Sequence, residues 1–379
     1  MLKPLLYTVD PEHYGDYLKE KTDAADALFE AVAPGCPGAK IHESAAEHFR
    51  NRAEFAVFHD GDRICYAMFE KKGRERIRHE VKSFPMAHEA INRAMQLLQE
   101  AAHSMDEIAR NLFEAEFLCN TAGEVVITLD YHRRLDEAAW SAAAQDLIAF
   151  LADNGLKASA VARSRKQKIA VPGDCVLETI RTTDKRSFGL YEAEGCFTQP
   201  NTAVACRMVS FARECCAGQQ GRDLLELYCG SGTFTVCLAD LFRKALATEV
   251  ARVPAQIAAC NIKKNGITNI KTARLSAEEM SQALDGVRPF HRLMQIDCDL
   301  ETYDFSTLLI DPPRCGLGDD MSLSFTARFE RVIYISCNPA TQCEDLKTLL
   351  RTHRIARRAY FDQFPYTPHL ESGVLLVRR

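Results

Sequence analysis

The sequence predicts an α/β protein with two domains: an α+β domain with an antiparallel sheet over residues 1–190, followed by a Rossmann-like, mostly parallel and doubly wound sheet over residues 191–379. From about Phe197 apolar strands alternate with amphipathic helical segments, which is typical of a parallel sheet covered by helices. In the first half, segments that alternate apolar and polar residues flank turn residues, which is typical of antiparallel hairpins.

Length and composition favour a soluble globular protein. The 379 residues are 47% hydrophobic and 26% charged, which is enough for two cores. Acids and prolines interrupt the N-terminal segment and no long apolar run occurs, so we expect a cytoplasmic protein without a signal peptide or a membrane contact. Fifteen scattered cysteines lack paired CxxC spacing, so we expect reduced thiols and no metal.

The elements of the first half follow in order along the chain. Hairpins are expected over 53–70, around Asp60-Gly61, and over 117–132, around Gly123. Amphipathic patterns predict helices over 88–113 and 135–155, the second with Gly155 as its C-terminal cap. Strands follow over 157–171, 175–180 and 186–194.

Three basic runs, at 71–82, 132–134 and 163–168, all lie in the first half, although the net charge is -5. Such a run is most often a solvated face, but three in one half favour a surface that binds nucleic acid.

The second half begins with a strand over 223–229, which leads into Gly230-Ser231-Gly232 and a helix. The next strand ends at Glu249, where a carboxylate can accept hydrogen bonds from ribose hydroxyls. Thr235 stands where a dinucleotide fingerprint requires a third glycine, so we expect S-adenosylmethionine rather than NAD. A plain strand-to-helix turn is the alternative reading of a single GxG motif.

Two further strands end in chemically distinctive loops. The strand at 306–311 ends at Asp311 in DPPRCGL, and the strand at 331–336 gives way to Cys337, with Asn338 and Pro339 starting a helix. A helix N-terminus favours a thiolate by about 0.3–1 kcal/mol. Cys315 competes for the role, and a cysteine is most often only a small core residue.

A thiolate beside a methyl-donor pocket suggests methylation of a pyrimidine. Thiolate addition to C6 of uracil makes C5 nucleophilic, and a base must afterwards remove the proton from C5. Glu371, before the last strand, is the expected base, and His369 is its rival.

Five segments together resemble the bacterial tRNA (uracil-5-)-methyltransferases, which make ribothymidine at position 54 of the T loop: FTQPN (197–201), LLELYCGSG (224–232), DPPRCGL (311–317), YISCNP (334–339) and FDQFPYTPHLESGVLL (361–376). The similarity extends into the first half, through HFRNRAEFAVFHDGD and DYHRRLD.

The resemblance implies that Cys337 is the nucleophile and Glu371 the proton acceptor. It implies a cofactor site formed by Gln199, Tyr228, Gly230, Thr233, Glu249 and Asp311, and we expect RNA contacts at Arg52, Phe113 and His132. The chain departs from the family pattern at Thr233, Cys315 and Ser372, where the family more often has Asn, Ser and Cys. Ribosomal-RNA relatives carry an N-terminal cysteine cluster for an iron-sulfur centre, whereas the first-half cysteines here are widely spaced, which favours a tRNA substrate.

We therefore expect methylation of uridine in the T arm of tRNA, without an obligate protein partner. Three alternatives stay open: uridine in ribosomal or tRNA-like RNA, cytosine C5 in RNA, and a non-enzymatic module that folds RNA.

Overall fold

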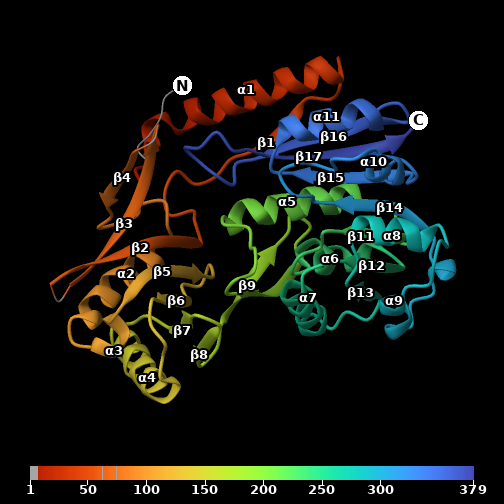
Figure 1. Ribbon diagram of the computed structural model, residues 1–379. Helices are drawn as coiled ribbons and strands as arrows, with labels where there is room; N and C mark the ends of the chain where they lie inside the picture. Colours follow the sequence, from red (N-terminus) through yellow and green to blue (C-terminus); the bar gives the residue numbers. More distant parts are fainter. Residues whose placement is uncertain (1–6, 62, 74) are drawn as a thin grey trace.

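The computed structural model describes residues 7–61, 63–73 and 75–379, so Arg74 of the first basic run lies outside the described residues. The chain builds two large sheets, with a two-stranded ribbon between them (Figure 1). None of the helices in these ranges is both long and apolar enough to cross a membrane.

The first sheet has seven strands in the order β4-β3-β2-β5-β6-β7-β8. All neighbours are antiparallel except β6 and β7, which are parallel because helix α4 crosses between them. The elements are β2 (Arg52–Asp60), β3 (Arg63–Lys72), β4 (Glu75–Glu80), α2 (Glu89–Ala102), α3 (Asp106–Ala109), β5 (Leu112–Cys119), β6 (Val125–Tyr131), α4 (Glu137–Asp153), β7 (Ala158–Ser164) and β8 (Gln167–Val171).

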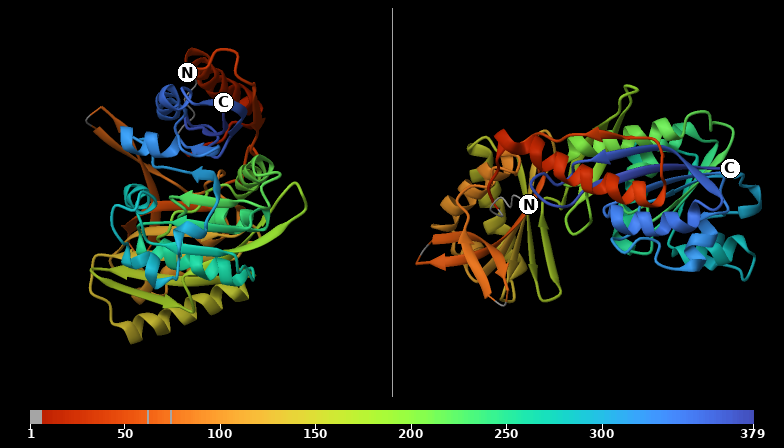
Figure 2. Two further views of the ribbon diagram at one scale, coloured as in Figure 1. Left: turned by 90° about the vertical axis from the view of Figure 1, so that its right-hand side faces the viewer. Right: turned by 90° about the horizontal axis from the view of Figure 1, so that it is seen from above.

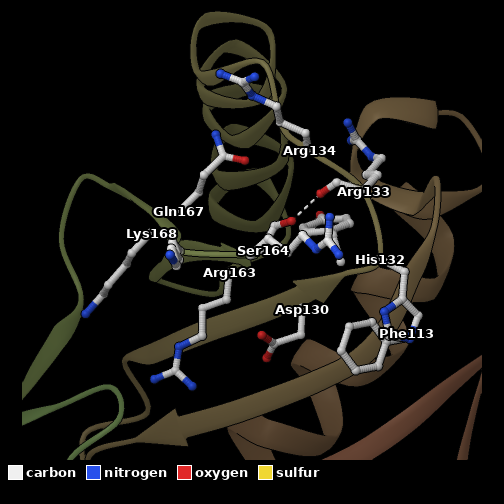
Figure 3. Close-up of a pocket in the computed structure, with 12 residues that line it drawn as sticks. Phe113, Asp130, His132, Arg133, Arg134, Arg163, Ser164, Gln167 and Lys168 are labelled. Carbon is white, nitrogen blue, oxygen red and sulfur yellow. Dashed lines mark hydrogen bonds between the residues drawn. The ribbon is translucent and has the colours of Figure 1, made fainter.

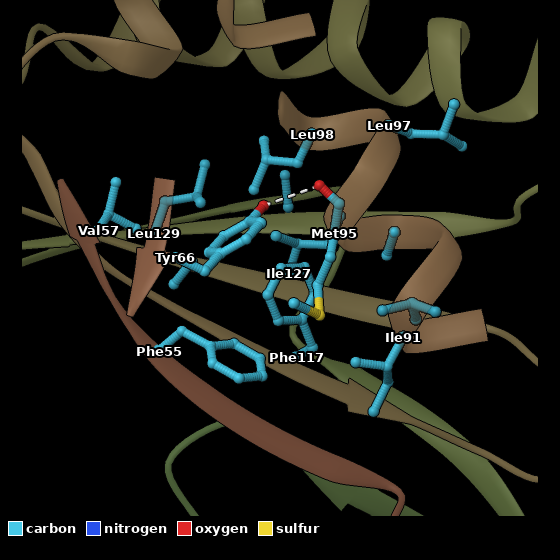
Figure 4. Packing of buried hydrophobic residues seen from close by; sticks show 14 of the residues in the cluster. Phe55, Val57, Tyr66, Ile91, Met95, Leu97, Leu98, Phe117, Ile127 and Leu129 are labelled. Atoms are coloured by element: carbon cyan, nitrogen blue, oxygen red, sulfur yellow. Dashed lines mark hydrogen bonds between the residues drawn. The ribbon is translucent and has the colours of Figure 1, made fainter. Parts of the chain in front are cut away.

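Helices α2 and α4 cover one face of this sheet and enclose its core. Trp140 of α4 is fully buried, and Phe55, Tyr66 and Phe117 meet beneath α2 (Figure 4). The buried Tyr66 hydroxyl donates to the carbonyl oxygen of Met95 at 3.0 Å, so this aromatic core leaves no hydroxyl without a partner.

One helix in this half is shorter than predicted. The expected helix over 88–113 ends at Ala102, and β5 begins at Leu112 after the short α3 and a left-handed turn at Asn111. Strand pairing with β2 and β6 buries Leu112, Ala115 and Phe117, and this tertiary gain outweighs the local helical pattern.

The second sheet has eight strands in the order β1-β16-β17-β15-β14-β11-β12-β13, and only β17 runs antiparallel to its neighbours. Its strands are β1 (Ala39–His42), β11 (Asp223–Leu227), β12 (Lys244–Thr248), β13 (Ile270–Ala273), β14 (Phe305–Ile310), β15 (Arg331–Ser336), β16 (His353–Phe361) and β17 (Glu371–Arg378). The predicted fold class, a mostly parallel sheet preceded by an α+β part, is confirmed.

Helices cover both faces of this sheet, as a doubly wound fold requires. They are α5 (Thr202–Cys215), α6 (Thr233–Leu238), α7 (Arg252–Lys264), α8 (Ala277–Leu284), α9 (His291–Gln295), α10 (Asp320–Thr326) and α11 (Pro339–Leu349), with short 3-10 turns at Pro11–His13, Ala239–Leu241 and Leu300–Thr302. Strand β11 lies between β12 and β14, so the chain direction across the sheet reverses there, and ligands of such folds bind at that point.

The beginning of the chain lies with this second sheet. Helix α1 (Tyr14–Val32) packs Ala25 and Phe29 into the same apolar cluster as Leu346 of α11, and β1 pairs in parallel with β16. Figure 2 shows the red helix alongside the blue strands from both directions. The predicted domain boundary at residue 190 stays a prediction. That prediction did not anticipate that the N-terminal segment packs with the second sheet.

The ribbon β9 (Cys175–Arg181) and β10 (Ser187–Ala193) connects the two sheets. Asn261 of α7 and Asn265, the C-terminal cap of that helix, accept hydrogen bonds from the backbone N–H groups of Tyr191 and Gly189 on β10. The ribbon is therefore fixed to the second sheet through the helix that follows β12.

Candidate active site

Cys337 lies where β15 ends and α11 begins, as the sequence predicted. Asn338 caps the helix, because its side chain accepts from the backbone N–H of Ala340 at 3.2 Å. The amide of Asn338 and the hydroxyl of Thr341 both donate to the carbonyl oxygen of Arg314, at 3.2 and 3.1 Å. These bonds hold the loop that contains Arg314 against the loop that contains the thiol.

The surroundings of Cys337 oppose its ionisation. Burial raises the pKa of the half-buried thiol to about 11, the nearby Glu371 and Asp311 add to the increase, and Arg314 acts against them. The helix N-terminus was expected to favour the anion, but burial and two carboxyl groups outweigh it. These surroundings therefore favour the protonated thiol at neutral pH.

Glu371 is the first residue of β17, opposite Phe361 of β16, and its side chain is buried. Burial raises its pKa well above the ordinary value, and the nearby Asp311 raises it further. Burial likewise raises the pKa of Asp311 to about 7. Three predicted residues thus come together from the ends of β14, β15 and β17.

The two rivals occupy different positions. Cys315 is exposed, and its sulfur lies over the carbonyl oxygen of the following Gly316 at 3.7 Å. The ring of His369 contacts the guanidinium of Arg314, with Nδ1 of His369 2.6 Å from Nη2 of Arg314. Burial lowers the pKa of His369, and the positive charge of Arg314 lowers it further. The structure thus pairs His369 with a cation that the sequence did not single out, although Arg314 lies in the quoted DPPRCGL motif.

The turn after β11 has the shape of a ligand-binding loop. Gly230 and Gly232 have φ of +54° and +81°, and a Cβ at Gly232 would lie 3.1 Å from that of Ala258. Tyr228, with φ of +60°, is held in the same left-handed region. The two carboxylate oxygens of Glu249 accept from the backbone N–H groups of Gly230 and Ala251, at 3.0 and 2.8 Å.

Two unpartnered polar atoms, one of them in this turn, fit a ligand that supplies hydrogen bonds. Within the described residues, Gln199 Oε1 and Ser231 Oγ are buried without a hydrogen-bond partner, and such atoms are expected where a ligand supplies the partner. Each oxygen of Glu249 keeps a second lone pair for a ribose hydroxyl. Thr233 is half-buried at the first position of α6. The residues present therefore suit S-adenosylmethionine.

The structure also explains Thr235, which breaks the dinucleotide fingerprint. Its hydroxyl donates at 2.7 Å to the carboxyl group of Glu226, a buried residue of β11 whose pKa is raised to about 8 by burial. A glycine at this position would leave that carboxyl group without its partner.

A separate basic pocket lies on the first sheet, between the ends of β6, β7 and β8 (Figure 3). The rings of Phe113 and His132 stack there with centroids 3.7 Å apart and planes 5° from parallel. Its other charged lining residues are Asp130, Arg133, Arg134, Arg163, Arg165, Lys166 and Lys168. Cationic side chains beside an exposed ring stack suit single-stranded nucleic acid.

Arg52 does not belong to this pocket. Its guanidinium forms an ion pair with the buried Glu116 and donates to the carbonyl oxygen of Cys196 at 2.7 Å. The structure therefore gives Arg52 partners within the protein, outside the basic pocket, and its expected RNA contact stays a prediction.

Comparison with known sequences gives a family match over nearly the whole chain. The family model described as tRNA (Uracil-5-)-methyltransferase matches residues 13–379. A protein of Stutzerimonas stutzeri named tRNA/tmRNA (uracil-C(5))-methyltransferase is 45% identical over 372 residues, 98% of this chain and 99% of the relative. A protein of the same name from Actinobacillus pleuropneumoniae is 43% identical over 373 residues, covering 97% and 99%.

Among solved structures, the tRNA (uracil-54, C5)-methyltransferase of Pyrococcus abyssi, in complex with S-adenosyl-L-homocysteine, resembles this chain with a TM-score of 0.68. The two are 19% identical, and the match covers 96% of this chain and 83% of the other. This likeness supports the fold.

Proposed function

The chain belongs to the tRNA (uracil-5-)-methyltransferase family, and from this premise we propose that it methylates C5 of uridine at position 54, in the T loop of tRNA. S-adenosylmethionine, when bound, supplies the methyl group that C5 receives. The observation that carries the proposal is the convergence of a strand-end thiol with the carboxyl groups of Asp311 and Glu371, where Asp311 follows a strand that pairs with β11.

The proposed role of Cys337 is addition to C6 of the uracil ring. The thiol must lose its proton first, because the thiolate is the nucleophile. A carboxylate whose pKa is raised is a stronger base than an ordinary one, so Asp311 is a suitable acceptor for that proton, and Glu371 stays free for the later step. Arg314 is the cation that favours the resulting anion.

The proposed role of Glu371 is removal of the proton from C5 after C5 has been methylated. The electron pair of the C5–H bond forms the C5–C6 double bond, and the C6–S bond breaks to release the thiolate of Cys337. Burial supports this role, since it excludes the water that would otherwise compete for the proton.

We propose that the cofactor is held by six residues: Gln199, Tyr228, Gly230, Thr233, Glu249 and Asp311. The unpartnered Gln199 oxygen and the glycine turn support this proposal.

The T arm would bind to the stacked rings of Phe113 and His132 and to the arginines and lysines around them. The target base must be flipped out of the T arm, at a cost of a few kcal/mol. Because the bacterial relatives are named for tRNA and tmRNA, a tRNA-like RNA is a second substrate to test. Such a substrate and the free cysteines of the described residues agree with a cytoplasmic location.

Incubation of the protein with unmodified tRNA and labelled S-adenosylmethionine, followed by nucleoside analysis, tests this proposal. The expected product is 5-methyluridine at position 54. Transfer to cytidine alone would reject the proposal in favour of the cytosine alternative, and no transfer to any RNA would favour a non-enzymatic module.

The thiol assignment is tested with a matched pair of cysteine variants. Cys337→Ala should abolish both methylation and any denaturant-resistant adduct between protein and RNA, whereas Cys315→Ala, at an exposed site, should retain both. The opposite pattern would assign the nucleophile to Cys315.

A further inference from the structure

A buried lysine of the N-terminal helix holds the loop that leads to the proposed base. Lys21 of α1 has only 7% of its side chain exposed and pairs with Asp362, whose side chain is fully buried. Its ammonium group also donates to the carbonyl oxygens of Phe364 and His369, both at 3.1 Å, and of Thr367 at 3.5 Å. Four acceptors from one short loop therefore converge on a single cation.

This loop connects β16 to β17 and ends at Glu371. It contains no regular structure, and Tyr366 in its middle has φ of +62°, a strained conformation that persists only where other contacts impose it. With so few backbone hydrogen bonds of its own, the loop depends on contacts from outside to fix the position of its last residue.

Helix α1 supplies a second contact to the same carboxylate. The hydroxyl of Tyr14 donates to Asp362 at 2.8 Å and accepts from the backbone N–H of Ser44 at 2.8 Å. The rings of Tyr14 and Tyr17 lie edge-on to the ring of Tyr366. The helix thus contacts both ends and the middle of the loop, although it precedes the loop by more than three hundred positions.

Burying an ammonium group is costly unless it is fully hydrogen-bonded, and burial lowers the pKa of Lys21 despite its pairing with Asp362. An apolar side chain could join α1 to this sheet at a smaller cost, as Phe29 does about two turns further along the same buried face. The buried carboxylate of Asp362 requires a cation, and the three carbonyl oxygens require hydrogen-bond donors, so an apolar side chain could satisfy neither. The position of the loop is therefore what the lysine specifies.

We propose that Lys21 is a positioning residue for proton removal: it fixes the loop 362–370 so that Glu371 reaches the C5 proton of the methylated adduct. The inference rests on the proposed function. Lys21 touches neither substrate nor cofactor, and its contribution is confined to the step in which Glu371 takes the proton and the bond between C6 and the sulfur of Cys337 breaks. Addition of the thiol depends on a different loop, so that step should be nearly independent of Lys21.

Two variants test the proposal, with a uridine-containing T-arm hairpin and labelled S-adenosylmethionine. Lys21→Met keeps the length of the side chain but removes the cation. The double variant Lys21→Met/Asp362→Asn also removes the buried charge that the single variant leaves unpaired, so it should fold even if the single variant does not. Lys19→Met is the matched control, because Lys19 lies on the same helix with 72% of its side chain exposed.

Both variants should accumulate methylated, denaturant-resistant adduct, with release of methylated RNA slowed about tenfold to a hundredfold, while the rate of adduct formation changes little. Lys19→Met should behave like the unmutated protein. Equal losses in formation and release, or loss of folding in both variants, would show a purely structural contact and overturn the positioning role. If the unmutated protein formed no 5-methyluridine, the proposed function itself would fail, which is a separate result.

Discussion

At the scale of single residues, the most unusual property of the candidate site is the raised pKa of its thiol and of its carboxyl groups. Cys337, with its pKa raised to about 11, has to lose a proton before it can add to C6, and Glu371 has to be ionised before it can take one. Both requirements favour alkaline solution. The sequence suggested the opposite for the thiol, because the helix N-terminus is visible in it, whereas the burial of the thiol and its closeness to Asp311 and Glu371 are not.

The first prediction concerns the pH dependence of adduct formation. The rate should continue to increase above pH 9, the ordinary range of a thiol, toward about 11, because only the ionised fraction of Cys337 reacts. Single-turnover measurements with a T-arm hairpin over a pH series would check this. Arg314→Met should move the increase to higher pH, since Arg314 lowers the pKa of the thiol. A rate that levels off below pH 8 would contradict the prediction.

A second prediction at this scale concerns stability. The folded protein binds the proton of Glu371 more tightly than the unfolded chain does, so its stability falls as pH rises from about 4.5 through the raised pKa. Glu371→Gln cannot ionise, and it should raise the midpoint of thermal unfolding by a few degrees at neutral pH but not in acid.

Thermal unfolding at several pH values would test this, with Glu301→Gln at an exposed position as the control. The same Glu371→Gln variant should trap methylated adduct, because the proton on C5 has no acceptor. A variant that is less stable than the parent at neutral pH would argue that the carboxylate is needed for folding.

Sequence reasoning located Cys337 and Glu371 because each stands at the end of a strand that is readable from local pattern. It did not find Lys21, whose partners lie near the other end of the chain, nor the contact between Arg314 and His369. Pairings over such separations leave no local signal in one sequence.

Among the structural elements, the turn between β11 and α6 allows a sharp test of the cofactor site. Gly232→Ala places a Cβ 3.1 Å from that of Ala258 on α7, so α7 or the turn must move. The KM for S-adenosylmethionine should increase about tenfold or more, while thiol addition to RNA without cofactor changes little.

Gly218→Ala is the matched control, since Gly218 has a similar φ of +80° but open space around it. Gly218→Ala should lower stability through the same strained backbone conformation, but it should leave the KM for S-adenosylmethionine unchanged. Equal effects of the two substitutions would show that backbone strain alone, rather than the shape of the turn, is responsible.

The elements of the second half were predictable because each strand is a short apolar run bounded by turn residues. The helix over 88–113 was predicted too long because the amphipathic pattern continues into residues that β2 and β6 recruit as a strand. The parallel pairing of β6 with β7 was missed since it depends on where α4 crosses the sheet, which local alternation of residues does not encode.

For the whole molecule, the uneven distribution of charge predicts a strong salt effect on RNA binding. The protein carries a net charge of -5, yet cations line the pocket on the first sheet. The Kd for tRNA should rise steeply with salt, because phosphate contacts release counterions.

Arg165→Gln should reduce the slope of log Kd against log salt by about 1, the value expected for the loss of one phosphate contact. Arg165 is suitable because it is an exposed cation of the pocket. Phe113→Ala should weaken binding by about 1–3 kcal/mol with an unchanged slope, because stacking involves no counterion. Binding that is insensitive to salt would place the RNA on another surface.

The two-part organisation was predictable from the change of rhythm near Phe197, but the course of the first forty residues was not. Helix α1 and β1 carry no motif, and their position follows from pairing with β16 and packing on α11. Ion pairs between distant strands, such as that of Arg52 on β2 with Glu116 on β5, are equally invisible in one sequence.

The pairing of β1 with β16 has a consequence for biosynthesis. Ala39 leaves the ribosome among the first residues, but its partner Arg358 is among the last. We expect the edge formed by β1 to stay unpaired through most of translation, so that stalled chains ending before β16 remain sensitive to protease near residue 40 and released chains become resistant there. Catalytic competence would then arise only after β16 and β17 have been synthesised, because the proposed base Glu371 belongs to β17.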